Sequence, residues 1–302
     1  MITFLAPYRC GYMEKIIKEY IETGCSIQHL KRKYGIPPMK ISNAIKAAGY
    51  EVINKQNQIK FDEHIFDKID TEEKAYWLGF IWADGNIAKR DYCFEMSLAE
   101  KDKDHLQKFN DFIKHIRPIK EKKCKLHDKT FIAYRVSFNS KHFWNTLNNY
   151  GCVPNKSLTL KFPDLTVFEN KDLVNHFIRG YFDGDGCISH CNKTHTKIAF
   201  ILCGTTEMLN TISTILGKPN YKLQSKPNTK CMELCFNHFT ALSTLHKIYN
   251  NASIYLKRKY QLYKEYCRVY EELYTLSRGK IGEGCDANTE QIIDISKGSM
   301  AA

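Results

Sequence analysis

An internal repeat, which begins near residue 61 and extends over most of the chain, limits the folds open to this sequence. Each copy opens with a segment of helical periodicity, IDTEEKAYWLGFIWADGNI in the first and KDLVNHFIRGYFDGDGCIS in the second. An alternating strand, a short helix, a strand pair and another helix follow in both copies. A unit that recurs in this way predicts two similar halves built on one plan.

The order of elements within each copy predicts an α+β fold with antiparallel sheets. We expect two pseudo-symmetric α-β-β-α-β-β-α halves, at residues 61–165 and 166–277. A last helix near residues 253–276 carries an apolar stripe and should pack across these halves. The polar tail at residues 278–302 is expected to be disordered.

Residues 1–52 precede the repeat and contain three short segments with apolar residues at helical spacing. Pro37 and Pro38 suit the first turn of the third helix, where amide donors are unpaired in any case. The other face of this helix is polar and carries Lys40, Ser42, Asn43 and Lys46. The pattern is typical of a helix-turn-helix module that enters the major groove of DNA, although a plain three-helix packing module has the same periodicity. Residues 53–60 are polar and nearly aperiodic, as expected of a linker.

The charge of the chain favours a polyanionic partner. The formal net charge is +12 and the isoelectric point is about 9.0, so nucleic acid is the leading candidate. Many ordinary enzymes are also basic, so charge alone does not decide. No window approaches the ~20 apolar residues of a membrane span, and the opening MITFLAPYRC lacks the features of a signal peptide. We therefore expect an intracellular, cytoplasmic protein without a membrane partner.

The twelve cysteines are scattered along the chain, and we expect them to be reduced. In two pairs, Cys187 with Cys191 and Cys231 with Cys235, three residues lie between the thiols instead of the two usual in zinc knuckles. On strands this spacing puts both thiols on one face. Packing in the core as small hydrophobic residues is favoured over a zinc site.

The opening helices of the two copies should pack closely against each other. Gly79 and Ala83 lie four apart on the first helix, and Gly180 and Gly184 lie four apart on the second. Small residues at this spacing allow helix backbones to approach closely. The first helix has no polar face and should be buried on all sides. Asp70 is its expected cap, with Glu73 at capping-box spacing.

Each of these helices ends in an aspartate followed by glycine, Asp84-Gly85 and Asp185-Gly186. A carboxylate at a helix C-terminus faces the negative end of the helix dipole, and two carboxylates side by side repel. Mg²⁺ would relieve this conflict, because it prefers carboxylates, waters and phosphate oxygens. The pattern predicts a site for about two or three Mg²⁺ ions shared by Asp84 and Asp185, suited to phosphodiester hydrolysis. For a single copy, an ordinary Asp-Gly turn would be the simpler interpretation.

The segments WLGFIWADG and FIRGYFDGDG resemble the two copies of the motif that names the LAGLIDADG homing endonucleases, and the resemblance covers residues 61–276. It implies that Asp84 and Asp185 bind the catalytic metal. It also implies saddle-shaped sheets over the major groove and a monomer that cuts both strands of a long asymmetric DNA site across the minor groove. This chain departs from the motif at Trp82, where the second copy has Asp183, but that position is not the family's metal ligand.

Members of this family often have a lysine near each active centre, and alignment of the repeats assigns Lys156 and Lys259 to that role. A lysine that only contacts phosphate is the alternative for each. Base contacts are expected from alternate positions of the sheet strands. The candidates are Lys120, Lys122, Arg135, Lys222, Gln224 and Lys226. An intron RNA maturase or a DNA-binding regulator on the same fold is the alternative function.

Overall fold

The computed structural model describes residues 8–23, 25–50, 52, 61–126, 129–191, 197–225 and 229–278. The chain divides into two compact units, residues 1–60 and residues 61–302. The expected linker at 53–60 and the expected tail beyond residue 278 lie outside the described residues. Among the described helices, none combines the length and the apolar character needed to cross a membrane.

The first unit contains the three helices that the periodicity predicts. They are α1 (Tyr8–Thr23), α2 (Ile27–Tyr34) and α3 (Pro38–Ala47). Ser26 caps α2 by accepting a hydrogen bond from the backbone amide of His29. Gly35 ends the same helix at a φ of 70°, in the left-handed region that favours glycine. The buried side chains that join the three helices are Ile16, Tyr20, Leu30, Ile41 and Ile45.

The second unit contains the order α-β-β-α-β-β-α twice, as predicted. The first copy comprises α4 (Glu72–Asp84), β1 (Gly85–Ala88), β2 (Cys93–Ala99), α5 (Lys103–Phe112), β3 (Lys120–Leu126), β4 (Lys129–Asn139) and α6 (Lys141–Asn149). The second comprises α7 (Leu173–Asp185), β5 (Gly186–His190), β6 (Ile198–Gly204), α8 (Thr206–Ile215), β7 (Gln224–Ser225), β8 (Met232–Asn237) and α9 (His238–Tyr249). Helix α10 (Lys257–Arg278) follows, and a short 3-10 helix at Lys156–Leu158 lies between the copies.

Each copy forms one four-stranded antiparallel sheet, with strand order β1-β2-β4-β3 in the first and β5-β6-β8-β7 in the second. Phe94 lies opposite Phe138 in the first sheet, and Phe200 lies opposite Phe236 in the second. All four rings are buried, whereas the alternate positions of these strands are mostly partly exposed. The sheets therefore have one core face and one more open face, as the alternation predicts.

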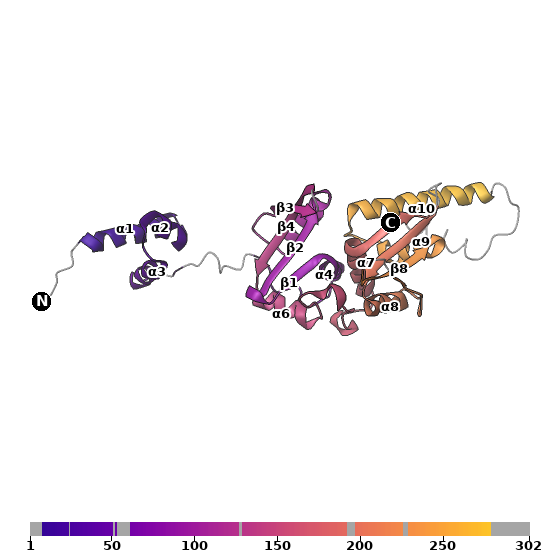
Figure 1. Ribbon diagram of the computed structural model, residues 1–302, viewed down its shortest axis with the longest axis horizontal. Helices are drawn as coiled ribbons and strands as arrows, with labels where there is room; N and C mark the ends of the chain where they lie inside the picture. Colours follow the sequence, from indigo (N-terminus) through magenta and orange to yellow (C-terminus); the bar gives the residue numbers. More distant parts are fainter. Residues whose placement is uncertain are drawn as a thin grey trace. The chain divides into compact units, whose positions relative to one another are not determined.

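Helices cover the core face of each sheet and leave α4 and α7 in the middle of the unit, between the two sheets (Figure 1). In the first half, Phe143 of α6 contacts Phe94 and Phe138, with ring centroids 5.3 and 5.0 Å apart. In the second half, α8 and α9 contact β6 and β8. The expected burial of the first central helix is confirmed, because Tyr76 through Trp82 are all buried.

Two predictions of local structure are wrong: the cap of α4 and the core packing of the paired cysteines. The cap of α4 is Thr71, whose Oγ1 accepts from the amide of Lys74, while Asp70 forms an ion pair with the Lys74 side chain at 2.8 Å. Both Asp70 and Thr71 are good capping residues, and the helix begins one residue later than the sequence suggests.

The paired cysteines do not pack in the core. Cys187 and Cys191 are exposed, and Cys231 and Cys235 are partly exposed. Ile188, Leu234 and Phe236 occupy the core positions of β5 and β8. The cysteines in these strands fall on the alternate positions and so belong to the open face.

Candidate active site

The backbones of α4 and α7 touch where their glycines face each other. A Cβ atom added at Gly79 would lie 2.0 Å from the carbonyl oxygen of Phe177, and one at Gly180 would lie 1.9 Å from that of Tyr76. One turn further along, a Cβ at Gly184 would lie 2.2 Å from the Cβ of Ala83. Larger side chains at these positions would force the helices apart.

This packing brings the ends of the two helices together, and with them the carboxylate pair, Asp84 and Asp185. A Cβ at Gly184 would lie 3.2 Å from Oδ2 of Asp84, so the Asp84 carboxylate lies directly beside the end of α7. Asp84 is partly buried and Asp185 is exposed. Among the residues that the structure describes, neither carboxylate accepts a hydrogen bond or forms an ion pair.

The electrostatic environment of the carboxylate pair disfavours two negative charges. Burial, together with the charge of Asp185, raises the pKa of Asp84 to about 6. The surrounding protein also removes part of the water around the Asp185 carboxylate, and this desolvation raises its pKa. The positive charges of Lys156 and Lys259 oppose this effect. The two lysines therefore compensate only part of the effect that disfavours two ionised carboxylates.

The two lysines assigned by repeat alignment bind the ends of the helices. The Lys156 Nζ donates to the carbonyl oxygens of Trp82 at 2.6 Å and Ala83 at 2.8 Å. The Lys259 Nζ donates to the carbonyl oxygens of Phe182 at 2.7 Å and Asp183 at 2.8 Å, and also to that of Gly186. The ammonium groups thus satisfy carbonyls that a helix end leaves without partners, and they lie at its negative pole.

Burial lowers the pKa of both lysines, and that of Lys259 falls to about 8. Lys259 is almost fully buried, whereas Lys156 is partly buried. Both ammonium groups lie close enough to the carboxylate pair to influence the pKa of the two aspartates. Their hydrogen bonds, however, go to backbone carbonyl oxygens.

Asp183, two residues before the end of α7, has a different environment. Its buried carboxylate accepts hydrogen bonds from the hydroxyls of Tyr76 and Tyr249 and from the amide of Leu256, at 2.8, 2.5 and 2.7 Å. At the equivalent position of α4, the indole of Trp82 donates to the carbonyl oxygen of Lys161 at 3.0 Å. Both side chains hold a backbone segment that also carries one of the two lysines.

The donor set of the carboxylate pair fits a hard divalent cation. Two carboxylates with free lone pairs, side by side and partly open to solvent, are the ligands that Mg²⁺ takes together with water and phosphate oxygens. Burial and the charge of Asp185 raise the pKa of Asp84, and the positive charge of a bound cation would counteract both effects.

The predicted DNA-contacting residues lie on exposed or partly exposed positions where they are described. On the open face of the first sheet, Glu95 pairs with Lys122 at 2.7 Å and with Arg135 at 3.3 Å. This acidic partner was not anticipated, although alternation places Glu95 on the same face. The other exposed candidates are Lys120, Lys222 and Gln224 in the second unit and Lys40, Asn43 and Lys46 on α3. Ser42 is partly buried, and Lys226 lies outside the described residues.

Neither protein-family models nor curated proteins match the sequence. Several solved structures are similar in fold. The LAGLIDADG meganuclease I-AabMI bound to uncleaved DNA is 16% identical, with a TM-score of 0.44 over 74% of this chain and 98% of that one. The homing endonuclease I-WcaI bound to its DNA recognition sequence is 18% identical, with a TM-score of 0.49 over 77% and 96%. Full-length DUF199/WhiA from Thermatoga maritima is 17% identical, with a TM-score of 0.41 over 79% and 73%. The likeness is distant, so an activity must be argued from the residues of this chain.

Proposed function

We propose that this protein is a site-specific homing endonuclease that hydrolyses one phosphodiester in each strand of duplex DNA and leaves staggered ends. The observation that carries the proposal is the carboxylate pair: Asp84 and Asp185 end two helices in backbone contact and have no protein partner among the described residues. A carboxylate with a purely structural role is expected to accept hydrogen bonds from the protein, as Asp183 does.

Asp84 and Asp185 would hold the divalent cations, with Mg²⁺ expected. When bound, such a cation activates water and stabilises the leaving oxygen of a phosphodiester. The close backbone contact of α4 and α7 at Gly79 and Gly180 brings the ends of the helices, and so the two carboxylates, together. Lys156 and Lys259 hold the helix ends, and their charges oppose the rise in the pKa of both aspartates, which favours the ionised form that binds metal.

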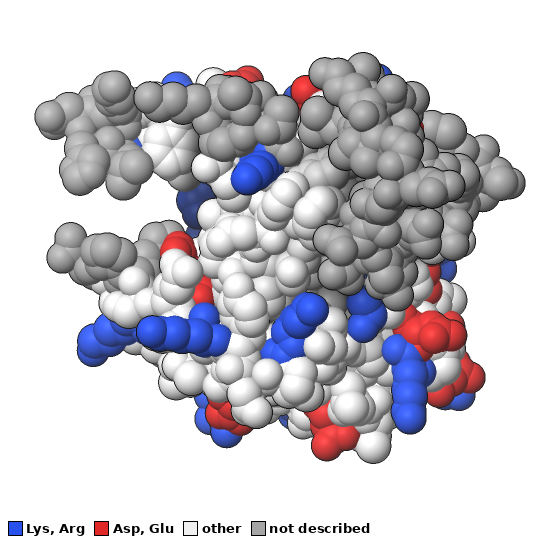
Figure 2. Space-filling view, turned by 90° about the vertical axis from the view of Figure 1, so that its right-hand side faces the viewer, with Lys and Arg blue, Asp and Glu red and all other residues white. Residues whose placement is uncertain are grey.

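The motif resemblance and the charge of +12 support duplex DNA as the substrate. The open faces of the two sheets offer alternate side chains of the kind that reach base edges in a major groove. Among the coloured residues on the side drawn in Figure 2, Lys and Arg side chains are scattered over a surface that is mostly uncharged and includes acidic residues. We assign the base-contacting role to the sheets because alternate side chains on their open faces can reach base edges.

The first unit is proposed to extend the DNA contact as a helix-turn-helix module. Lys40, Asn43 and Lys46 lie three residues apart on α3, and all three are exposed. Residues at this spacing share one helix face, which could lie along a groove. Substituting these three residues together should weaken DNA binding without removing cleavage at saturating protein.

The decisive experiment is cleavage of a pool of duplex DNA that includes the sequence flanking the gene. The full chain is compared with Asp84→Asn, with Asp185→Asn and with the double variant, in Mg²⁺ and in chelator. Asp104→Asn is the matched control, because Asp104 is exposed on α5 and has no partner among the described residues. We expect the wild type and the control to cut both strands at one sequence, and only in Mg²⁺. The Asp84→Asn, Asp185→Asn and double variants should not make these double-strand cuts.

Full double-strand cutting by either Asn variant would refute the catalytic assignment. Tight binding of duplex DNA without cutting by the wild type would instead favour a DNA-binding regulator. Tight binding of a structured intron RNA without cutting of DNA would favour a maturase.

A further inference from the structure

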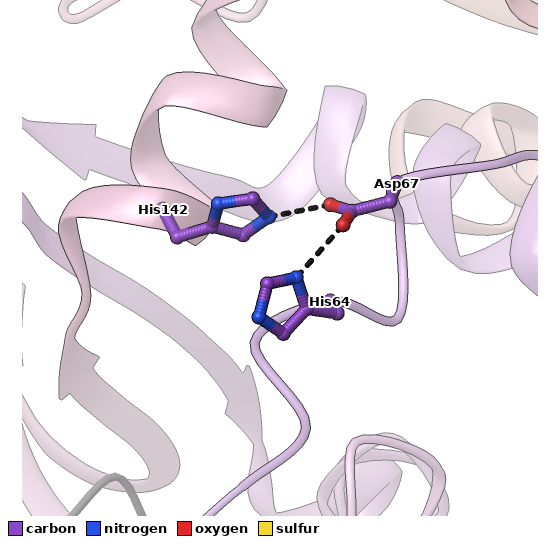
Figure 3. Close-up of side chains that lie close together, drawn as sticks. All are labelled: His64, Asp67 and His142. Atoms are coloured by element: carbon purple, nitrogen blue, oxygen red, sulfur yellow. Dashed lines mark hydrogen bonds and ion pairs between the residues drawn. The ribbon is translucent and has the colours of Figure 1, made fainter.

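A second group of metal-ligating side chains, the histidine cluster, consists of His64, Asp67 and His142 (Figure 3). The Nδ1 of His64 lies 2.8 Å from Oδ2 of Asp67, and the Nε2 of His142 lies 2.6 Å from Oδ1 of the same carboxylate. The two imidazole rings are tilted by 45° with their centroids 4.1 Å apart. None of these residues belongs to α4 or α7, so the cluster is separate from the carboxylate pair.

The backbone around the cluster is held in place before any ligand binds. His64 and Asp67 belong to one turn, closed by a hydrogen bond from the Asp67 amide to the His64 carbonyl at 3.0 Å. The Tyr150 hydroxyl donates to the carbonyl oxygens of Phe66 and Asp67, which attaches this turn to the end of α6. At the other end of α6, the Ser140 hydroxyl donates to Glu63. Preorganisation of this kind lowers the cost of binding a ligand.

We propose that His64, Asp67 and His142 bind one Zn²⁺ ion, with solvent in the fourth position. The geometry carries the proposal: one donor atom from each residue lies within 4.8 Å of the other two. Tetrahedral zinc with bonds of about 2.0–2.1 Å holds its donors about 3.3 Å apart. The two hydrogen-bonded pairs, at 2.8 and 2.6 Å, would lengthen by about 0.5–0.7 Å, and any donor pair near the 4.8 Å limit would close by up to about 1.5 Å, to admit the ion.

The chemistry of the donors selects the class of metal. Two imidazole nitrogens and one carboxylate suit zinc and its transition-metal neighbours, whereas Mg²⁺ prefers oxygen ligands alone. The cluster is also open to solution, since the side chains of His64, Asp67 and His142 are 64%, 40% and 40% exposed. A metal can therefore enter without unfolding.

The charges around the cluster favour a cation. Asp62 and Glu63 lie near His64 and act on it electrostatically in the same direction as Asp67. The N-terminus of α6 opposes cation binding through its dipole, and these carboxylates offset that effect. In the metal-free protein, the hydrogen bond that His64 donates to Asp67 raises the pKa of His64.

The role expected of the ion is structural. His64 and Asp67 lie at the start of the second unit, and His142 lies in the first turn of α6, 75 residues beyond Asp67. A metal bridging them would attach the first residues of this unit to α6 and would stabilise the folded state by mass action.

The test is a zinc titration of metal-free, full-length protein in competition with a chromophoric chelator at neutral pH. His64→Gln and His142→Gln are compared with the wild type, and His29→Gln is the matched control, since His29 is an exposed histidine of α2. We expect each cluster variant to weaken the tightest zinc site by at least about tenfold, equivalent to about 1.4 kcal/mol. The control should leave it unchanged.

The twelve cysteines can also bind zinc, so the ligands themselves must be identified. X-ray absorption of wild-type protein carrying one equivalent of zinc should show nitrogen and oxygen ligands at about 2.0–2.1 Å. Sulfur ligands alone, at about 2.3 Å, would overturn the proposal. Equal zinc affinity of the wild type and both cluster variants would overturn it as well, leaving a cluster in which two histidines share Asp67 through hydrogen bonds only.

Discussion

A single methyl group at residue 180 would test whether the contact between α4 and α7 is as close as the glycines indicate. The Cβ of Gly180→Ala would lie 1.9 Å from the carbonyl oxygen of Tyr76 and 2.8 Å from the amide nitrogen of Phe80, whereas ordinary contact begins near 3.4 Å. Both neighbours are backbone atoms, so no change of rotamer relieves the clash. The helices must separate by about 1.5 Å, and overpacking of a dense core costs about 1–3 kcal/mol.

We expect the upper end of that range, a loss of about 3 kcal/mol in the free energy of unfolding, because a buried backbone has to move. For a unit of this size the loss corresponds to a fall in melting temperature of about 6–12 °C. All three tryptophans, Trp77, Trp82 and Trp144, lie in the second unit, so tryptophan fluorescence during denaturant unfolding follows this unit alone. The same separation would displace the carboxylate pair, and a displacement of about 1 Å can lower activity about 100-fold.

Gly11→Ala is the matched control. Gly11 lies in α1, a Cβ added there would meet no described residue within 4 Å, and alanine is favoured over glycine in a helix interior by about 1 kcal/mol. The same substitution should therefore stabilise the first unit, which is measured by circular dichroism. If Gly180→Ala unfolds within about 0.5 kcal/mol of the wild type, α4 and α7 are not in backbone contact and the reasoning fails.

Two further predictions concern the charges at the helix ends. The pKa of Asp84 lies at about 6 in the folded state and near 3.8 in the unfolded state, so the folded state binds this proton more tightly and ionisation above pH 6 is destabilising. In metal-free protein, Asp84→Asn should raise the free energy of unfolding by up to about 3 kcal/mol at neutral pH. The gain should vanish as the pH falls from above 6 to below 3.8, and denaturant unfolding at several pH values checks it; a gain independent of pH would contradict the assignment. Lys259→Met leaves three backbone carbonyls without their donor and should cost about 3 kcal/mol, whereas the exposed control Lys257→Met should cost less than about 0.5 kcal/mol. Equal losses for the two variants, measured by fluorescence-monitored unfolding, would argue against the capping role.

The sequence predicted the order of elements because each signal is local and occurs twice. Strand alternation placed Phe94 and Phe200 on core faces, and the spacing of Gly180 and Gly184 predicted a helix contact. In contrast, the ion pairs of Glu95 with Lys122 and Arg135 depend on the register of three strands, which no local pattern defines.

The histidine cluster also could not be predicted from local sequence patterns. His64 and Asp67 are three residues apart, but His142 joins them only because α6 packs beside the turn, 75 residues later in the chain. No spacing pattern in the sequence connects the three residues. A pairing of this kind depends on tertiary packing, so it becomes visible only with the fold.

The environments of Asp183 and Asp185 separate an aspartate that is bound by the protein from the proposed metal ligand within a single motif. Asp183 accepts three hydrogen bonds and holds the segment at Leu256, which leads to Lys259. Trp82 at the equivalent position of the first copy holds the segment at Lys161, close after Lys156, with an indole donor instead of a carboxylate acceptor. The equivalent positions of the two copies therefore make contacts of opposite polarity, but each contact fixes the segment that carries a lysine. Because neither Asp84 nor Asp185 takes part in these contacts, a tryptophan at residue 82 is compatible with an intact carboxylate pair.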